Sequence, residues 1–227
     1  MKIVFDIGGS VLCSEGTPKE EMIRHYSEFL LSLTAEGHEI VVIVGGGRLA
    51  RNYIDISGKF SDERDFLDNI GIHATRLNAM VLISSLGEHA NKKVPASISE
   101  LKRSIGTKKI TVMGGLKPRQ TTDAVSVQAA KVLGADLILI CTDVNGIYDK
   151  NPKHHYKVKM FLKISPAQVN KIIEKDAFIP GHSSVIDPVA VKLLMKNKIK
   201  AIVLNGKDIE NIRNAIKGNE FLGTTVE

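Results

Sequence analysis

Three strand-like apolar runs of the sequence each end in a cluster of glycines, a pattern that suits phosphate binding. The clusters follow Phe5, Val44 and Met113. In open α/β sheets, ligands bind beyond the carboxyl ends of the strands, where glycine lets backbone N–H groups approach an oligophosphate. One cluster alone is weak evidence, because a tight turn between a strand and a helix also favours glycine. Three in the same position predict a phosphate site, although none is a Walker A loop or a GxGxxG motif.

The second glycine cluster continues into a predicted helix that carries a cation. In the segment GGGRLAR, Arg51 lies one helical turn after Gly47 and on the same face. Its guanidinium group could add bidentate contacts to a phosphate held by backbone N–H groups. Arg51 is therefore a candidate catalytic and phosphate-binding residue, and the alternative is an ordinary solvated arginine.

The third cluster opens the segment GGLKPRQTTDA, which gathers charged and hydroxyl side chains at the start of a predicted helix. These are Lys117, Arg119, Thr121, Thr122 and Asp123. A threonine at this place is an ordinary helix cap, and a cap is our first expectation for Thr121. A cap does not explain the whole group, so the segment is a second candidate binding region.

Strand-like and helical patterns alternate along the chain, which predicts right-handed βαβ units around a mostly parallel sheet, an α/β fold. The expected strands are 2–5, 39–44, 109–113, 136–141 and 201–204, with an edge strand at 224–226 and a polar hairpin at 150–160. The expected helices are 18–36, 48–90 with a break near Gly58, 121–133, 166–175, 184–196 and 209–216. The irregular stretch 95–106 suggests one domain with an N-terminal lobe (1–106) and a C-terminal lobe (107–227).

Composition narrows the class of protein. A chain of 227 residues, 43% hydrophobic, can bury the core of one large domain. The net charge is +6, but the cations are scattered without aromatic interleaving, so we expect no nucleic-acid partner. Cys13 and Cys141 end apolar runs and are expected to be buried thiols. There is no apolar run of 18 residues and no signal-peptide pattern, so we expect a cytosolic protein without a membrane span.

Six motifs in order resemble the amino-acid-kinase superfamily, and most of all its uridylate kinases in their archaeal form. They read FDIGGS, VGGGRLAR, LDNIGIHATRLNA, VMGG with TTDA, TDVNGIY and SSVIDPVAVK, and the resemblance covers 2–227. It implies a three-layer α/β sandwich, an N-terminal lobe that binds the acceptor and a C-terminal lobe that binds ATP with Mg²⁺. It also implies a homohexamer and the reaction of ATP with UMP to give ADP and UDP.

The resemblance assigns roles to residues on the acceptor side. Gly46 belongs to the UMP site, Gly47 and Arg51 serve phosphate binding, and Asp68 takes the ribose hydroxyls of UMP, which an acceptor-only carboxylate suits. The segment that wraps the uracil and the α-phosphate consists of Leu116, Lys117, Pro118, Arg119, Gln120, Thr121 and Thr122.

On the ATP side, the resemblance places Gly9 and Ser10 against the phosphates. Asp123 matches an aspartate that orients the cationic groups of the active site. Thr142, Tyr148 and Asn151 match positions that line the adenosine site, although Asn151 replaces the aspartate that commonly precedes proline there.

The sequence departs from the superfamily at the end of the first strand, where Asp6 stands in place of a common lysine. Asp6 and Asp123 join Arg51 as candidate catalytic residues. A carboxylate beside oligophosphate needs a neutralising partner, and two are considered: Mg²⁺, or a cation such as Lys192 or Arg119. The third reading is a turn residue that caps the following glycines.

Two alternative functions remain open for a protein of this fold. One is a kinase for another small acceptor, such as isopentenyl phosphate, carbamate or an amino acid; the other is a silent nucleotide-binding protein. In phosphoryl transfer to UMP the nucleophile is an ionised phosphate oxygen, so none of the 7 histidines is expected to be a catalytic base. A stripe of apolar residues at 79–86 is wider than one buried face needs, which agrees with a subunit contact.

Overall fold

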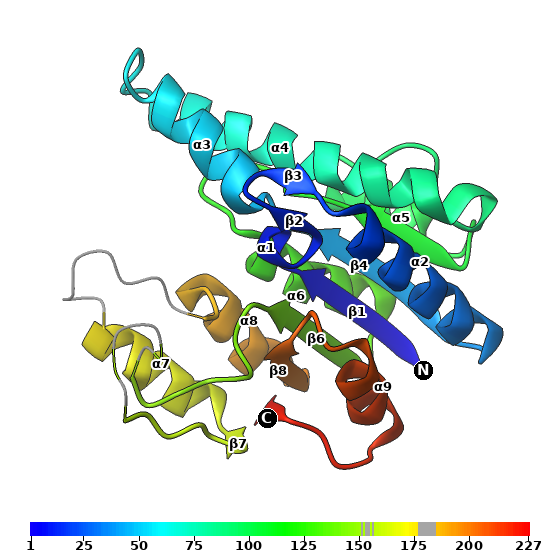
Figure 1. Cartoon of the computed structure of the whole chain (residues 1–227), viewed down its shortest axis with the longest axis vertical. Coiled ribbons are helices and arrows are strands. Elements are labelled where there is room, and N and C mark those ends of the chain that lie inside the picture. Colours follow the sequence, from blue (N-terminus) through cyan, green and yellow to red (C-terminus); the bar gives the residue numbers. More distant parts are fainter. Residues whose placement is uncertain (151, 153–154, 156, 177–184) are drawn as a thin grey trace.

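The structure is a computed structural model that describes residues 1–150, 152, 155, 157–176 and 185–227. Within these residues a seven-stranded sheet forms the centre of the molecule (Figure 1). Neighbouring strands are parallel except for the pair β8 and β9. In spatial order the strands are β5 (Ile110–Met113), β4 (Glu39–Val44), β1 (Lys2–Ile7), β6 (Leu137–Thr142), β8 (Ala201–Asn205), β9 (Gly223–Val226) and β7 (Lys163–Ile164).

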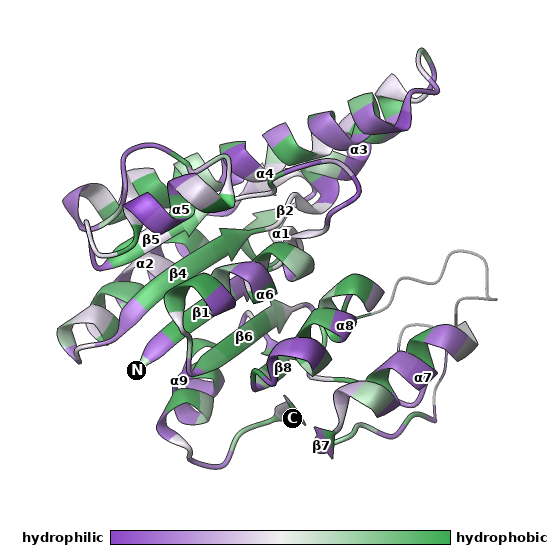
Figure 2. Ribbon diagram, turned by 180° about the vertical axis from the view of Figure 1, so that it is seen from behind, coloured by the Kyte–Doolittle hydropathy of each residue, from purple (hydrophilic) through white to green (hydrophobic). Residues whose placement is uncertain are grey.

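Helices cover both faces of this sheet and complete the predicted three-layer sandwich (Figures 1 and 2). One layer consists of α2 (Glu20–Ala35), α4 (Arg64–Leu86) and α9 (Ile209–Lys217); the other consists of α5 (Ile98–Ser104), α6 (Thr122–Leu133), α7 (Pro166–Asp176) and α8 (Pro188–Asn197). Successive side chains of a strand point to opposite faces. Phe5 therefore packs in the core between the sheet and the layer of α2, α4 and α9, and Val4 packs in the core on the opposite face. Asp6 points to the same face as Val4, toward α6.

Two shorter helices follow the strands that carry the glycine clusters. Helix α1 (Gly9–Leu12) comes directly after β1, and α3 (Gly47–Ser57) comes after β4. Helix α3 packs against α4, and the connected ends of the two helices project beyond the sheet (Figure 1). No helix in the described part of the chain has the length and apolar character needed to cross a membrane.

Most predicted elements are confirmed, including the break near Gly58, and several short elements and one strand position differ. The strand expected at the C-terminus is present as β9, but its expected place at the edge of the sheet is wrong: β9 lies between β8 and β7, because β7 adds one more strand outside it. The irregular stretch contains α5, whose capping box pairs Ser97 with Glu100: Ser97 Oγ accepts from Glu100 N at 3.1 Å, and Glu100 Oε2 accepts from Ala96 N at 2.9 Å. Three short strands, β2 (Cys13–Ser14), β3 (Thr17–Pro18) and β7, and the short helix that follows β1 were not predicted.

The expected hairpin at 150–160 and the expected boundary between two lobes can be compared with the structure only in part. Tyr148 and Met160 form an antiparallel bridge at the base of the expected hairpin, while residues 151, 153, 154 and 156 lie outside the described residues. Strand β5 follows the suggested lobe boundary yet pairs with β4, so the sheet is continuous across it. The division into two lobes remains a prediction. Both cysteines are buried free thiols, as expected.

Candidate active site

The three glycine turns lie side by side at the carboxyl edge of the sheet, because β5, β4 and β1 are neighbours. The first two turns touch through bare backbone. A Cβ atom built on Gly9 would stand 2.2 Å from the nitrogen of Gly47, and Gly47 has a φ of +59°, which disfavours other residues. Side chains at these positions would push the turns apart. Glycine is therefore required for the two turns to form one backbone-lined floor.

The N-terminus of α3 forms one wall of this floor and can receive an anion. Its N-cap residue, Gly46, offers no side-chain hydrogen bond to the first turn. The free N–H groups and the helix dipole both favour a phosphate there. Arg51 is exposed one turn further along α3 and has no ion pair with any described residue. This agrees with the phosphate-binding role predicted for Gly46, Gly47 and Arg51, which remains a prediction.

Helix α4 supports the second glycine turn from behind through a buried asparagine. Asn78, only 2% exposed, donates from Nδ2 to the carbonyl oxygens of Gly45 at 2.9 Å and Gly46 at 3.4 Å. The Sγ atom of Cys13 approaches Oδ1 of the same asparagine at 3.8 Å. A buried amide that satisfies turn carbonyls fixes their direction, since leaving them unpaired would be costly.

The same helix holds the third glycine turn. Thr75 Oγ1 accepts from Gly115 N at 2.7 Å, and Arg76 donates to the carbonyls of Gly115 at 3.1 Å and Leu116 at 3.2 Å. Sequence reasoning assigned no role to Thr75, Arg76 or Asn78. A signal was present, since Thr75 and Asn78 are polar residues three positions apart on the otherwise apolar, buried face of a helix.

Asp68 meets the predicted acceptor-binding segment. Its Oδ2 atom accepts a hydrogen bond from the backbone nitrogen of Arg119 at 2.8 Å, across 51 positions of sequence. The Nε atom of Arg119 lies 2.9 Å from Oδ1 of Asp65, one turn earlier on the same helix. Arg119 itself has a φ of +61°, an uncommon conformation that these two contacts hold in place. The structure thus brings Asp68 and the 116–122 segment together.

The remaining residues of this segment differ in exposure. Thr121 caps α6, accepting from Ala124 N at 3.2 Å, as expected of an ordinary cap. Lys117 is exposed, while Leu116, Pro118, Gln120 and Thr122 are partly buried. The Oε1 atom of Gln120 is buried and has no hydrogen-bond partner in the described part of the chain. A buried acceptor of this kind is suited to a ligand donor.

Asp123 links the starts of two helices. Its Oδ2 atom accepts from the backbone nitrogen of Asp187 at 2.9 Å, and Asp187 in turn caps α8. Burial raises the pKa of Asp123 to about 6; the hydrogen bond from Asp187 opposes this rise and the Asp187 carboxylate adds to it. Asp123 is therefore fixed in position by backbone.

Asp6 lies behind Asp123, beneath the first turns of α6. It is 3% exposed, and its Oδ2 atom has no hydrogen-bond partner among the described residues. Burial, and then the Asp123 carboxylate, raise the pKa of Asp6 well above its usual value, while the Ser126 hydroxyl opposes the shift. Arg119, one of the two cations considered as a partner for Asp6, pairs with Asp65 instead. Lys192, the other, is exposed on α8.

Replacement of Asp6 by asparagine is expected to stabilise the metal-free protein at pH 8. A raised folded-state pKa means that stability is complete below the unfolded pKa and is lost as pH rises through the folded pKa. The amide removes the cost of a buried charge, so thermal melts in EDTA should show a midpoint at least about 2 °C higher, since 1 kcal/mol shifts the midpoint by about 2–4 °C. The gain should shrink at pH 5.

The control for this experiment is Asp55→Asn, which changes an exposed carboxylate of α3. A lower midpoint for Asp6→Asn at pH 8 would contradict the expectation and would indicate a cation paired with Asp6. Melts repeated with Mg²⁺ then test the metal-anchor reading, which predicts that the metal raises the wild-type midpoint more than that of the variant.

The predicted adenosine side is described in part. Thr142 ends β6, where its hydroxyl lies 3.4 Å from Asp143 Oδ1, and Tyr148 follows in the next loop. Ser10 is half-buried in α1, beside the turn after β1. Asn151 lies outside the described residues. Because β1 and β6 are neighbours, Ser10 and Thr142 lie at the same edge of the sheet.

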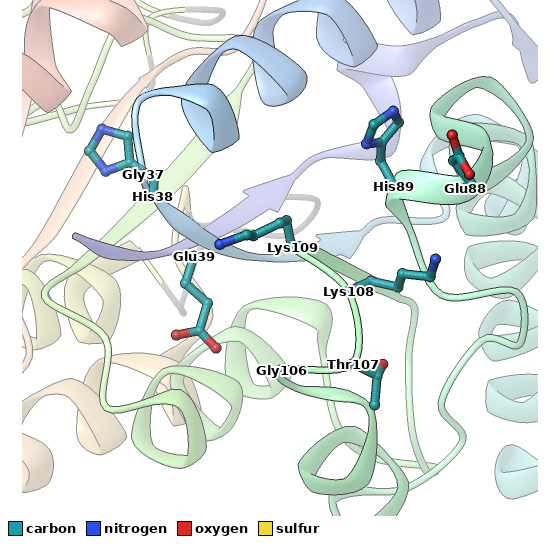
Figure 3. A pocket seen from close by; sticks show the side chains of 9 residues that line it. All are labelled: Gly37, His38, Glu39, Glu88, His89, Gly106, Thr107, Lys108 and Lys109. Carbon is teal, nitrogen blue, oxygen red and sulfur yellow. The ribbon is translucent and has the colours of Figure 1, made fainter.

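A separate cavity of about 610 Å³ lies at the other edge of the sheet (Figure 3). It is bounded by the turn before β4, the end of α4 and the turn before β5, with His38, Glu39, His89, Lys108 and Lys109 among its side chains. Since parallel strands bind ligands at their carboxyl ends, this amino-terminal cavity is not the candidate active site.

Comparisons with known proteins agree with this geometry. Residues 1–205 match the model of the Amino acid kinase family. The chain is 41% identical to the uridylate kinase of Methanocaldococcus jannaschii and 42% identical to that of Pyrococcus abyssi, over the full length of each protein. A crystal structure of the uridylate kinase from Archaeoglobus fulgidus is 37% identical, covers both chains completely and has a TM-score of 0.88.

Proposed function

The chain belongs to the amino acid kinase family, and on that premise we propose that it is a uridylate kinase, which transfers the γ-phosphoryl group of ATP to UMP. The reaction yields ADP and UDP, a step of pyrimidine nucleotide biosynthesis in the cytoplasm. One observation carries the choice of acceptor: the 2.8 Å hydrogen bond that joins Asp68 to the 116–122 segment. It puts a carboxylate suited to ribose hydroxyls beside a segment suited to a base and a phosphate.

The reaction asks for alignment and charge rather than for a side-chain nucleophile. The attacking atom is a phosphate oxygen of UMP, which is ionised at neutral pH, so no general base is required. Backbone N–H groups at the start of α3 and the guanidinium of Arg51 would hold phosphate where negative charge shifts during transfer. Asp123, fixed by the Asp187 backbone, would keep the start of α6 in register with this phosphate site.

The donor is expected to lie over β1 and β6. Gly9 and Ser10 follow β1 and would approach the ATP phosphates, while Thr142 and Tyr148 follow β6 and would line the adenosine site together with Asn151. The neighbouring positions of β1 and β6 support this division, since acceptor residues follow β4 and β5 on the other side of β1. The γ-phosphoryl group would then cross the floor formed by Gly9 and Gly47.

We propose that ATP is used as its Mg²⁺ complex. Mg²⁺ takes one or two carboxylates and completes its shell with phosphate oxygens and water. The partnerless oxygen of Asp6 and the neighbouring Asp123 suit the ion in kind, and the described residues contain no cluster of three or more acidic, His or Cys ligands. When bound, the ion would neutralise charge on the transferred group.

The function is tested by steady-state ADP formation with a panel of acceptors. UMP should be phosphorylated with a kcat/KM at least about 100-fold above that for isopentenyl phosphate, carbamate or N-acetylglutamate, because Asp68 and the 116–122 segment recognise ribose and base. A higher kcat/KM with one of the other acceptors would show that this acceptor, and not UMP, is the substrate. ATP binding without turnover of any acceptor would favour the silent nucleotide-binding protein.

We also propose that the protein forms a homohexamer. The surface available for subunit contacts differs from the stripe at 79–86 that the sequence predicts. Ala79, Leu82 and Leu86 of the predicted apolar stripe are buried in the protomer's own core, so they are not free for a partner. Met80 of the stripe is exposed, and so are other large apolar side chains of the projecting α3–α4 pair and the turn that joins it: Tyr53, Ile56, Phe60, Phe66 and Leu77. Such a concentration of exposed apolar side chains is typical of an interface.

Light scattering should therefore give a mass several times that of the 24.8 kDa chain. Substitution of Phe60 by aspartate should lower this mass, because Phe60 is 86% exposed and a charge in an apolar contact is costly. A wild-type monomer at micromolar concentration would contradict the assembly.

A further inference from the structure

We infer that Arg76 is a positioning residue of the acceptor site: it holds the backbone of the third glycine turn in the direction that acceptor binding requires. The inference rests on the proposed function for the identity of the acceptor. It extends that function to a residue on α4, outside the glycine turns and outside the 116–122 segment.

The contacts of Arg76 run across 39 and 40 positions of sequence to two consecutive carbonyl groups. Nε donates to the oxygen of Gly115 at 3.1 Å, and Nη2 donates to the oxygen of Leu116 at 3.2 Å. The preceding residue, Thr75, accepts from the nitrogen of Gly115 at 2.7 Å. Two adjacent residues of α4 therefore fix Gly115 at both its N–H and its C=O group.

The turn has little room to take up another position. A Cβ atom on Gly114 would stand 2.6 Å from Thr75 Oγ1, and one on Gly115 would stand 3.2 Å from the same atom. The backbone of the turn therefore packs directly on α4, and this contact fixes the distance between the turn and the helix. The hydrogen bonds that Arg76 donates to the carbonyl groups of Gly115 and Leu116 restrain the rotation of their peptide planes.

The rotation of these planes matters for a ligand. In a trans peptide the C=O and the following N–H point in opposite directions. By holding the carbonyls of residues 115 and 116, Arg76 directs the N–H groups of residues 116 and 117 away from α4. The next residues lead to Arg119, whose N–H binds Asp68. The orientation of the peptide planes at residues 115–117 therefore influences the conformation of the following residues, which we propose bind UMP.

Arginine suits this task better than lysine. Its planar guanidinium presents donors in a fixed fork, which can reach two neighbouring carbonyls at once, whereas a lysine ammonium is a point charge on a flexible stem. Both contacts are charge-assisted and only partly exposed to solvent. Arg76→Lys should therefore recover part of the function that Arg76→Met loses.

The experiment compares the wild type, Arg76→Met, Arg76→Lys and the control Arg24→Met, which removes an exposed arginine of α2. We expect Arg76→Met to raise the KM for UMP about 10- to 100-fold, with the KM for ATP within about twofold and kcat within about threefold. Arg76→Lys should lie between Arg76→Met and the wild type. Amide hydrogen exchange of the ligand-free protein should be faster for residues 114–120 in Arg76→Met and unchanged in the control.

Two results would overturn the inference. One is an unchanged KM for UMP in Arg76→Met. The other is a loss in which both KM values, kcat and the melting midpoint change together, as expected of a residue that only supports the fold. If the wild type does not phosphorylate UMP, the proposed function fails instead. Exchange in the ligand-free protein then decides alone whether Arg76 holds the turn.

Discussion

Replacement of Arg51 by methionine should lower kcat/KM for UMP phosphorylation by about 100-fold or more, the range found when a transition-state donor is removed. Methionine keeps the apolar stem and removes the charge that we propose acts on the anion site at the start of α3. The negative charge on the transferring group then loses this side-chain cation, while the backbone N–H groups and the neighbouring Arg48 of α3 remain. The melting midpoint should stay within about 2 °C, because Arg51 is exposed and has no ion pair with the described residues.

The matched control is Arg64→Met, which removes an exposed arginine from the start of α4. It should keep kcat/KM within about threefold of the wild type. Equal losses of activity and stability in Arg51→Met would indicate a structural role. A wild-type kcat/KM in the variant would remove Arg51 from the phosphate site.

Replacement of Asp68 by asparagine should weaken UMP binding about 10- to 100-fold and leave ATP binding unchanged. One lost charge-assisted hydrogen bond costs roughly 1.5–3 kcal/mol. The substitution is selective, because the amide oxygen can still accept from Arg119 N and keep the segment in place. What it loses is the negative charge and the second carboxylate oxygen, which is the one left for the ribose. Calorimetric titration with UMP and with a non-hydrolysable ATP analogue measures both affinities.

Asp65→Asn provides the control for this pair. It removes the ion pair with Arg119 Nε, which is exposed and contributes little, but not the backbone hydrogen bond to Asp68. UMP affinity should therefore change by less than about threefold. An unchanged UMP affinity in Asp68→Asn would exclude the ribose assignment, and an equal loss in both variants would indicate that only the shape of the segment matters.

The sequence predicts the sheet well because its strands carry two local signals at once, buried β-branched runs and glycines at their ends. The same signals predict that the turns after Phe5, Val44 and Met113 meet, since parallel strands present their carboxyl ends at one edge. The position of β9 needs the tertiary structure, because nothing local shows that β7 pairs outside it. The start of helix α5 does carry a local signal, the Ser97–Glu100 spacing of a capping box.

The candidate site is predictable only where its residues belong to a motif. Arg51 follows from its spacing to Gly47, and Thr121 follows from its place before a helix. Thr75, Arg76 and Asn78 act on turns 32 to 40 positions away, so no local pattern indicates their partners. The partner of Arg119 was unpredictable for the same reason, since its choice of Asp65 depends on how α4 packs against the third turn.

The transfer itself can be followed with ATP labelled with ³²P at the γ position, incubated with Mg²⁺, UMP and the purified protein. Thin-layer separation of the nucleotides should show the label in UDP, in an amount equal to the ADP formed. The initial rate of transfer should fall about 100-fold or more in Arg51→Met and stay within about threefold of the wild type in Arg64→Met. Label that stays in ATP, or that appears only as inorganic phosphate, would contradict the assignment of this chain as a UMP kinase.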